Sequence, residues 1–127
     1  MPRTILVADD EDDVRELVRL TLEEDGYEVL DAGDGDRAWR LLLEARPFMA
    51  ILDVTMPGRN GLELAQAITA EASLQHTKVV LLTGVSPIDL DGPGRRSPAE
   101  PQPRIDLYVM KPFTPRSLRE ALASELR

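Results

Sequence analysis

The sequence lacks cysteine, any long apolar run and an excess of positive charge. Without cysteine the chain can form no disulfide, no thiolate metal site and no cysteine nucleophile, which suits a reducing compartment. No run approaches the ~18 apolar residues of a membrane span. The opening MPRTILVADD also reaches an acidic cluster before a signal-type apolar region develops. We therefore expect a cytoplasmic protein that does not associate with membranes.

Acidic residues outnumber basic ones. The chain has 15 Lys and Arg against 23 Asp and Glu, a formal net charge of −8 at pH 7. Such a chain repels phosphate backbones and anionic lipids, so we expect no nucleic-acid binding by this domain and favour cations and basic partners. A hydrophobic content of 43% is enough for a core, and the length of 127 residues predicts one domain over 1–127.

Short apolar runs alternate with longer amphipathic segments. The apolar runs predict buried strands over 4–8, 27–32, 48–52, 78–82 and about 105–110. Helical spacing of apolar residues predicts helices over 12–25, around 38–45, around 62–68 and from 115 to about 126. We expect Gly26 to end the first helix in the left-handed conformation, and Thr114 to cap the last helix with Pro115 at its first position. This alternation predicts an α/β fold with right-handed crossovers, a mostly parallel sheet and helices on both faces.

One segment interrupts the alternation where a fourth helix is expected. Residues 84–104 contain five prolines and three glycines among 21 residues, a content typical of irregular structure. Prolines remove backbone donors and disfavour helical conformations in the residues before them. We therefore predict that a loop replaces or shortens the fourth helix.

Polar residues follow four of the predicted strands at their carboxyl ends. Asp9 and Asp10 follow the first strand, Asp53 the third, Thr83 the fourth and Lys111 the fifth. In an open parallel sheet these ends share one edge, where ligands bind. Three converging carboxylates repel one another unless a cation joins them, and Mg²⁺ prefers such oxygen ligands. With the positive charge of Lys111 and the hydroxyl of Thr83, this set suits a site that receives a phosphoryl group.

Four motifs identify a family. ILVADDEDD, ILDVTMPGRNG, LLTG and YVMKPF, in this order and at the ends of strands, resemble the receiver domain of two-component response regulators. The resemblance covers nearly the whole chain except 84–104. It implies a flavodoxin-like, doubly wound five-stranded sheet in the order 2-1-3-4-5.

The resemblance also implies roles for residues at matching positions. Asp53 would be the phosphoacceptor, taking a phosphoryl group from a phosphohistidine of a histidine kinase or histidine phosphotransfer protein. Asp10 would bind Mg²⁺ directly and Asp9 through water, with Asp53 and the backbone carbonyl of Thr55 as further ligands. Lys111 would pair with Asp53 and then with the phosphoryl oxygens. Such a domain is a signalling phosphoacceptor rather than an enzyme.

Two further residues would transmit the phosphorylation signal. The resemblance implies that the Thr83 hydroxyl moves toward the phosphoryl group and that the Tyr108 side chain reports this movement to a downstream effector or a fused output domain. It also implies a cis bond between Lys111 and Pro112, which would aim the lysine inward.

The sequence departs from the family on its output side. The family usually reads phosphorylation through its fourth helix, fifth strand and fifth helix, so the Pro-rich 84–104 segment leads to the hypothesis that the readout passes through this loop. In the family, the side chains two positions after the acceptor and after the switch threonine control water attack on the acyl phosphate, and here these residues are Thr55 and Val85. Neither carries a carboxylate or carboxamide that orients water, so we predict slow self-dephosphorylation.

Other interpretations of these residues remain open at this point. The alternatives are that the acids of 9–13 only cap a helix, that Asp53 forms a turn, that Lys111 is a surface charge, and that Thr83 and Tyr108 serve only packing. His76 is expected to be a solvated loop residue and Trp39 a partly buried one. A receiver-like docking module, with phosphorylation secondary or lost, is an alternative function. A phosphohydrolase of the haloacid-dehalogenase type is a weaker one, because that family needs a second aspartate where Thr55 stands.

Overall fold

The computed structural model describes residues 3–85 and 103–127 and contains a parallel five-stranded sheet. The strand order is β2-β1-β3-β4-β5, so the predicted flavodoxin-like α/β class is confirmed. The elements are β1 (Thr4–Ala8), α1 (Asp12–Glu24), β2 (Glu28–Ala32), α2 (Gly35–Ala45), β3 (Met49–Asp53), α3 (Gly61–Ala70), the 3-10 helix η1 (Ala72–Leu74), β4 (Lys78–Thr83), β5 (Leu107–Met110) and α5 (Pro115–Leu122).

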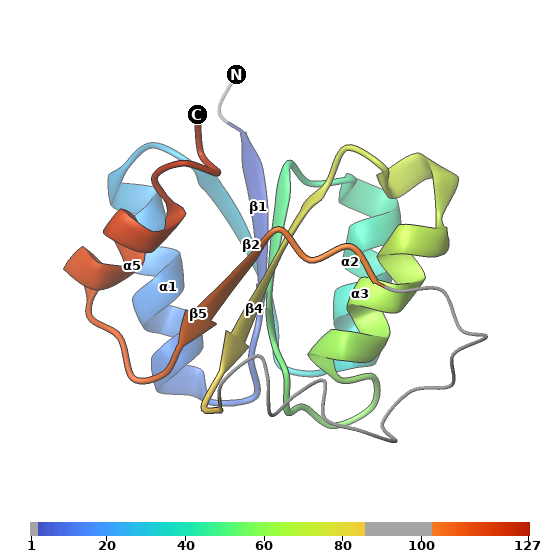
Figure 1. The fold of residues 1–127 in the computed structure, drawn as a ribbon, viewed down its shortest axis with the longest axis horizontal. Helices are drawn as coiled ribbons and strands as arrows, with labels where there is room; N and C mark the ends of the chain where they lie inside the picture. Colours follow the sequence, from blue (N-terminus) through green and yellow to red (C-terminus); the bar gives the residue numbers. More distant parts are fainter. Residues whose placement is uncertain (1–2, 86–102) are drawn as a thin grey trace.

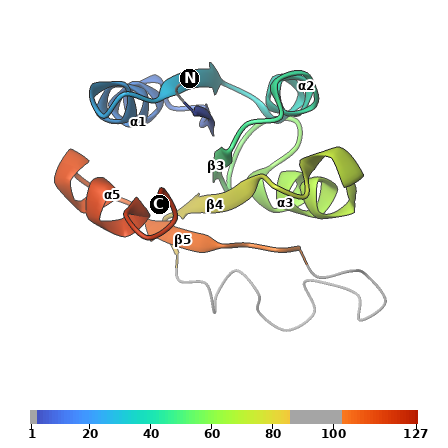
Figure 2. The same cartoon turned by 90° about the horizontal axis from the view of Figure 1, so that it is seen from above.

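Helices cover both faces of the sheet and enclose two apolar cores. Helices α1 and α5 lie on one face, and α2 and α3 on the other (Figures 1 and 2). Because successive side chains of a strand point to opposite faces, Ile5 and Val7 of β1 pack on the α1 and α5 side while Leu6 and Ala8 pack on the α2 and α3 side. The central strands are thus buried on both faces, which explains their nearly unbroken apolar runs.

The expected helix boundaries are largely confirmed. Gly26 has a φ of 92°, as its place after α1 predicts. Thr114 caps α5: its hydroxyl accepts a hydrogen bond from the backbone N–H of Ser117, and Pro115 is the first helical residue. None of the helices within 3–85 and 103–127 is long and apolar enough to cross a bilayer.

Two elements are shorter than the sequence predicts. β5 begins at Leu107, because the carboxylate of Asp106 accepts a hydrogen bond from the backbone N–H of Val79 where a strand carbonyl would otherwise bond. α5 ends at Leu122 and continues as turns, although the partly buried Leu126 still packs on the core. The short helix η1 was not predicted.

The loop expected over 84–104 lies mostly outside the described residues, which leave out 86–102. The carboxyl ends of the strands face away from both chain ends (Figure 1). The edge at which the candidate residues were expected is therefore remote from the N- and C-termini.

Candidate functional site

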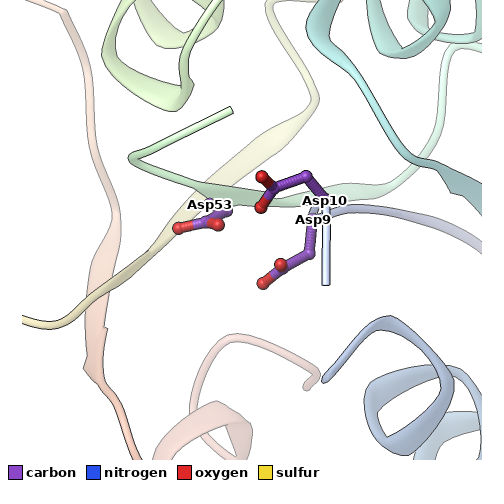
Figure 3. A group of neighbouring side chains, drawn as sticks. All are labelled: Asp9, Asp10 and Asp53. Atoms are coloured by element: carbon purple, nitrogen blue, oxygen red, sulfur yellow. The ribbon is translucent and has the colours of Figure 1, made fainter. Parts of the chain in front are cut away.

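Three aspartates converge at the carboxyl edge of the sheet. Asp9 and Asp10 follow β1, and Asp53 is the last residue of β3, the strand paired with β1. One carboxylate oxygen from each aspartate lies within 4.8 Å of those of the other two. Figure 3 shows their side chains gathered around one small space at the strand ends. The structure therefore brings together the three acids that the sequence analysis placed at this edge.

Asp9 and Asp53, the two buried aspartates, each use one carboxylate oxygen for a hydrogen bond within the turn after their own strand. Asp9 is fully buried and Asp53 is 5% exposed, whereas Asp10 is exposed. The Oδ1 atom of Asp9 accepts a hydrogen bond from the backbone N–H of Glu11 at 2.9 Å. The Oδ1 atom of Asp53 accepts one from the backbone N–H of Thr55 at 3.2 Å. Each buried carboxylate thus stabilises the turn after its strand with one oxygen and directs the other toward its neighbours.

Lys111 supplies positive charge to this space. Its Nζ atom lies 2.9 Å from Asp9 Oδ2, 3.3 Å from Asp53 Oδ2 and 3.5 Å from Glu11 Oε1. The bond between Lys111 and Pro112 is cis, as the resemblance implied. Partial burial lowers the pKa of Lys111, but its contacts with Asp9 and Asp53 outweigh this and raise the pKa above its usual value. The lysine is therefore a permanent cation, not a solvated surface charge.

One cation does not fully offset the acids. Burial, followed by the nearby charge of Asp9, raises the pKa of Asp53 from 3.8 to about 6. The backbone N–H of Thr55 and the ammonium of Lys111 act in the opposite direction without cancelling the increase. Asp53 is thus an electron-rich carboxylate that lacks full charge compensation.

The donor set fits a hard divalent cation. Asp9 Oδ2 is buried and, within the described part of the chain, receives no hydrogen bond, although it forms the ion pair with Lys111. The clustered side-chain donors are all carboxylate oxygens, the ligands that Mg²⁺ prefers. Capping of α1 does not account for this arrangement, because Asp9 contacts Lys111, which follows β5, and clusters with Asp53 at the end of β3.

Thr83 is the last residue of β4, and its hydroxyl forms hydrogen bonds within the loop that follows the strand. Its hydroxyl donates to the backbone carbonyl of Val85 at 2.8 Å and accepts from the Val85 N–H at 3.0 Å. Its backbone carbonyl accepts a hydrogen bond from the N–H of Lys111 at 2.7 Å. Tyr108 is half-buried and packs on the core beneath α2 and α3, in register with Leu81. The two candidate switch residues therefore lie on adjacent strands.

Sequence reasoning missed two residues of this region. Glu11 lies beside Lys111, and Arg15 of α1 donates to the backbone carbonyl of Asp9. Glu11 is one of several consecutive acids after β1, so the sequence does not single it out. The spacing of Arg15 three residues after Asp12 would by itself predict only a helical ion pair.

Two residues set aside in the sequence analysis behave as expected. His76 is exposed and its Nε2 atom lies 3.0 Å from the backbone carbonyl of Arg46. Trp39 is partly buried, with the Arg59 guanidinium 5.1 Å from its ring centre. The first contact is a hydrogen bond and the second a cation–π contact, and both lie outside the acidic group.

The raised pKa of Asp53 predicts that the free energy of unfolding of the metal-free chain depends on pH. A raised pKa in the folded chain adds stability below the ordinary value of 3.8, and that stability is lost as the pH rises through about 6. Asp53→Asn should therefore increase the free energy of unfolding by about 1–3 kcal/mol at about pH 7.5, and by less at about pH 4.5. Urea unfolding in EDTA measures both values.

Asp13→Asn is the matched control, since Asp13 is an exposed acid in the first turn of α1. This variant changes the net charge equally and should not reproduce the pH dependence. An Asp53→Asn effect of equal size at both pH values would contradict the interpretation.

Comparisons with known proteins identify the family of the chain. The response regulator receiver domain family model matches residues 5–123. The chain is 33% identical over 125 residues to the phosphate regulon transcriptional regulatory protein PhoB of Pseudomonas aeruginosa, covering 98% of this chain and 52% of that protein. It is 31% identical over 127 residues to the DNA-binding response regulator MtrA of Mycolicibacterium smegmatis, covering 100% and 52%. The chain thus spans about half the length of these curated relatives.

Solved structures agree as well. The chemotaxis response regulator CheY4 of Vibrio cholerae superposes with a TM-score of 0.84 at 29% identity, with 98% of each chain covered. The response regulator protein TrrA of Thermotoga maritima, in complex with Mg²⁺ and BeF, gives a TM-score of 0.77 at 34% identity, with 96% of this chain and 97% of that chain covered. From its motifs, its strand order and these likenesses, the chain belongs to the response regulator receiver domains, the signalling modules of two-component systems.

Proposed function

We propose that Asp53 is the phosphoacceptor of this receiver domain and takes its phosphoryl group from a phosphohistidine on a histidine kinase or histidine phosphotransfer protein. The observation that carries the proposal is the position of Asp53, a buried carboxylate 3.3 Å from Lys111 and clustered with two further acids. Because its pKa is raised, the ionised Asp53 carboxylate is more basic than an ordinary aspartate, which favours nucleophilic attack. A bound cation would offset the charge of the incoming phosphoryl group.

The transfer is a single displacement at phosphorus. An oxygen of Asp53 forms a bond to phosphorus, the bond from phosphorus to the donor imidazole breaks, and its electron pair returns to the imidazole nitrogen. Lys111 then neutralises charge on the phosphoryl oxygens. Asp9, Asp10, Asp53 and the backbone carbonyl of Thr55 would hold Mg²⁺, which when bound would offset the charge on the transferring group.

Thr83 and Tyr108 would convert phosphorylation into a signal. The Thr83 hydroxyl is bonded to the Val85 backbone, so movement toward a phosphoryl group requires these two hydrogen bonds to break. The loop after β4 would then be released from Thr83, which suits a readout by an effector protein or a fused output domain. We also propose that the domain acts in the cytoplasm.

The proposal predicts Asp53-dependent phosphorylation. Incubation with Mg²⁺ and phosphoramidate, which has the same P–N bond as phosphohistidine, should add one phosphoryl group to the wild-type chain, detected by intact mass spectrometry. Asp53→Asn and an EDTA-treated wild type should remain unmodified, and Asp13→Asn should react like the wild type. Modification of Asp53→Asn would contradict the assignment. No modification of the wild type would favour the docking-module interpretation.

A second prediction concerns the lifetime of the phosphorylated chain. Thr55 and Val85 are exposed and have no carboxylate or carboxamide to orient an attacking water. We expect the phosphorylated chain to lose its phosphoryl group over minutes or longer, which intact mass spectrometry measures as loss of the added mass. Thr55→Asn, which introduces a carboxamide, should accelerate decay about tenfold or more. Thr55→Val serves as the control and should leave the rate unchanged. Decay of the wild type within seconds would contradict this prediction.

A further inference from the structure

Arg15 on α1 connects to the acidic group through the backbone of Asp9. Its Nη1 atom donates to the Asp9 carbonyl oxygen at 2.8 Å, and its Nη2 atom donates to Asp12 Oδ1 at 2.7 Å. The Asp9 carbonyl belongs to the peptide unit between Asp9 and Asp10. Because a peptide unit is planar, a hydrogen bond to its oxygen fixes the direction in which the chain leaves Asp9 and enters Asp10.

The other polar atoms of Asp9 are held by different elements. Its N–H donates to the carbonyl of Ala32 at the end of β2, at 3.1 Å, and its Oδ1 atom accepts from the Glu11 N–H. Since β1 ends at Ala8, the Asp9 carbonyl lies beyond the strand. Arg15 thus adds a third contact that orients Asp9. Because this contact comes from a side chain and not from the backbone, a substitution can remove it.

The Arg15 side chain is itself well anchored. Only 21% of it is exposed, its Nε atom lies 3.7 Å from Asp31 Oδ2 of β2, and Asp12 holds the opposite side. A Cβ atom at Gly33 would lie 3.4 Å from Nη1, so the guanidinium packs directly over the turn after β2. A planar guanidinium held in this way presents its donors in a fixed geometry, which a lysine ammonium does not.

We propose that Arg15 is a positioning residue that fixes the peptide between Asp9 and Asp10 and thereby makes the acidic pocket selective for Mg²⁺ over Ca²⁺. This inference rests on the proposed metal site. Mg²⁺ demands near-ideal octahedral geometry at short distances, whereas Ca²⁺ accepts more ligands in flexible arrangements. A looser turn after β1 should therefore weaken Mg²⁺ binding more than Ca²⁺ binding.

Arg19 provides a matched control on the same helix. Its Nε atom also lies 3.7 Å from Asp31 Oδ2, but its other ion pairs are with Glu16 and Glu23 on the outer surface of α1. Removing positive charge from either arginine shifts the attraction for both divalent ions in the same direction. Only loss of the bond to the Asp9 carbonyl is expected to change the ratio of the two affinities.

The test measures the dissociation constants of Mg²⁺ and Ca²⁺ by amide NMR titration for the wild type, Arg15→Lys, Arg15→Gln, Arg19→Lys and Arg19→Gln. Both Arg15 variants should weaken Mg²⁺ binding about tenfold, and Ca²⁺ binding by less than about threefold. The Arg19 variants should keep the wild-type ratio. Urea unfolding in EDTA separates these effects from a general loss of stability.

Asp12→Asn is a second route to the same comparison if Arg15 variants fold poorly. Asp12 is 87% exposed on its side chain, so its replacement loosens the guanidinium without disturbing the core. The preference for Mg²⁺ should fall in the same direction by a smaller factor. Wild-type binding with an unchanged ratio in folded Arg15 and Asp12 variants would overturn the positioning role alone. Absence of Mg²⁺ binding by the wild type would instead contradict the metal site in the proposed function.

Discussion

Repulsion between carboxylates at the end of the sheet is the constraint on which the site depends. Asp9, Asp10 and Asp53 place an oxygen each within 4.8 Å of one another, and two of the three are buried. Lys111 contacts Asp9 and Asp53, yet the pKa of Asp53 stays near 6, so the compensation is incomplete. Entry of a divalent cation would lower the free energy of such a site, which would then tolerate the further negative charge of a phosphoryl group. The proposed ion binding and the proposed phosphoryl acceptance would thus both follow from one electrostatic imbalance.

The fold maintains this imbalance by rigid placement. β1 and β3 are adjacent in the sheet and buried on both faces, so their ends cannot move apart without disturbing both cores. α3 also begins close to the end of β3: a Cβ atom at Gly61 would lie 2.4 Å from the carbonyl oxygen of Asp53, which leaves room for glycine alone. Arg15 and the backbone N–H groups of Glu11 and Thr55 then orient the buried acids within this frame. The Thr83 hydroxyl is bonded to the backbone of Val85 in the loop after β4, so a movement of Thr83 as proposed would change the contacts of that loop.

Much of this arrangement was predictable from the sequence, for identifiable reasons. Apolar runs ending in polar residues located the strand ends, and the parallel order brought Asp9, Asp53 and Lys111 to one edge. The boundary of β5 was predicted less well, because Asp106 replaces a backbone bond with its own carboxylate and no periodicity reveals that. The role of Arg15 was missed for a related reason. Its partner is a main-chain carbonyl, and patterns of side-chain charge contain no information about such contacts.

The most direct test of the account is an amide NMR titration of the wild type and Asp53→Asn, first with Mg²⁺ and then with beryllofluoride as a phosphoryl mimic. The account predicts that Mg²⁺ shifts resonances near Asp10 and Thr55. Beryllofluoride should then cause changes that reach Thr83 and Tyr108 in the wild type and are absent in Asp53→Asn. Unchanged wild-type spectra with both ligands, or equal responses in the two chains, would contradict the claim that these carboxylates form a working phosphoacceptor site.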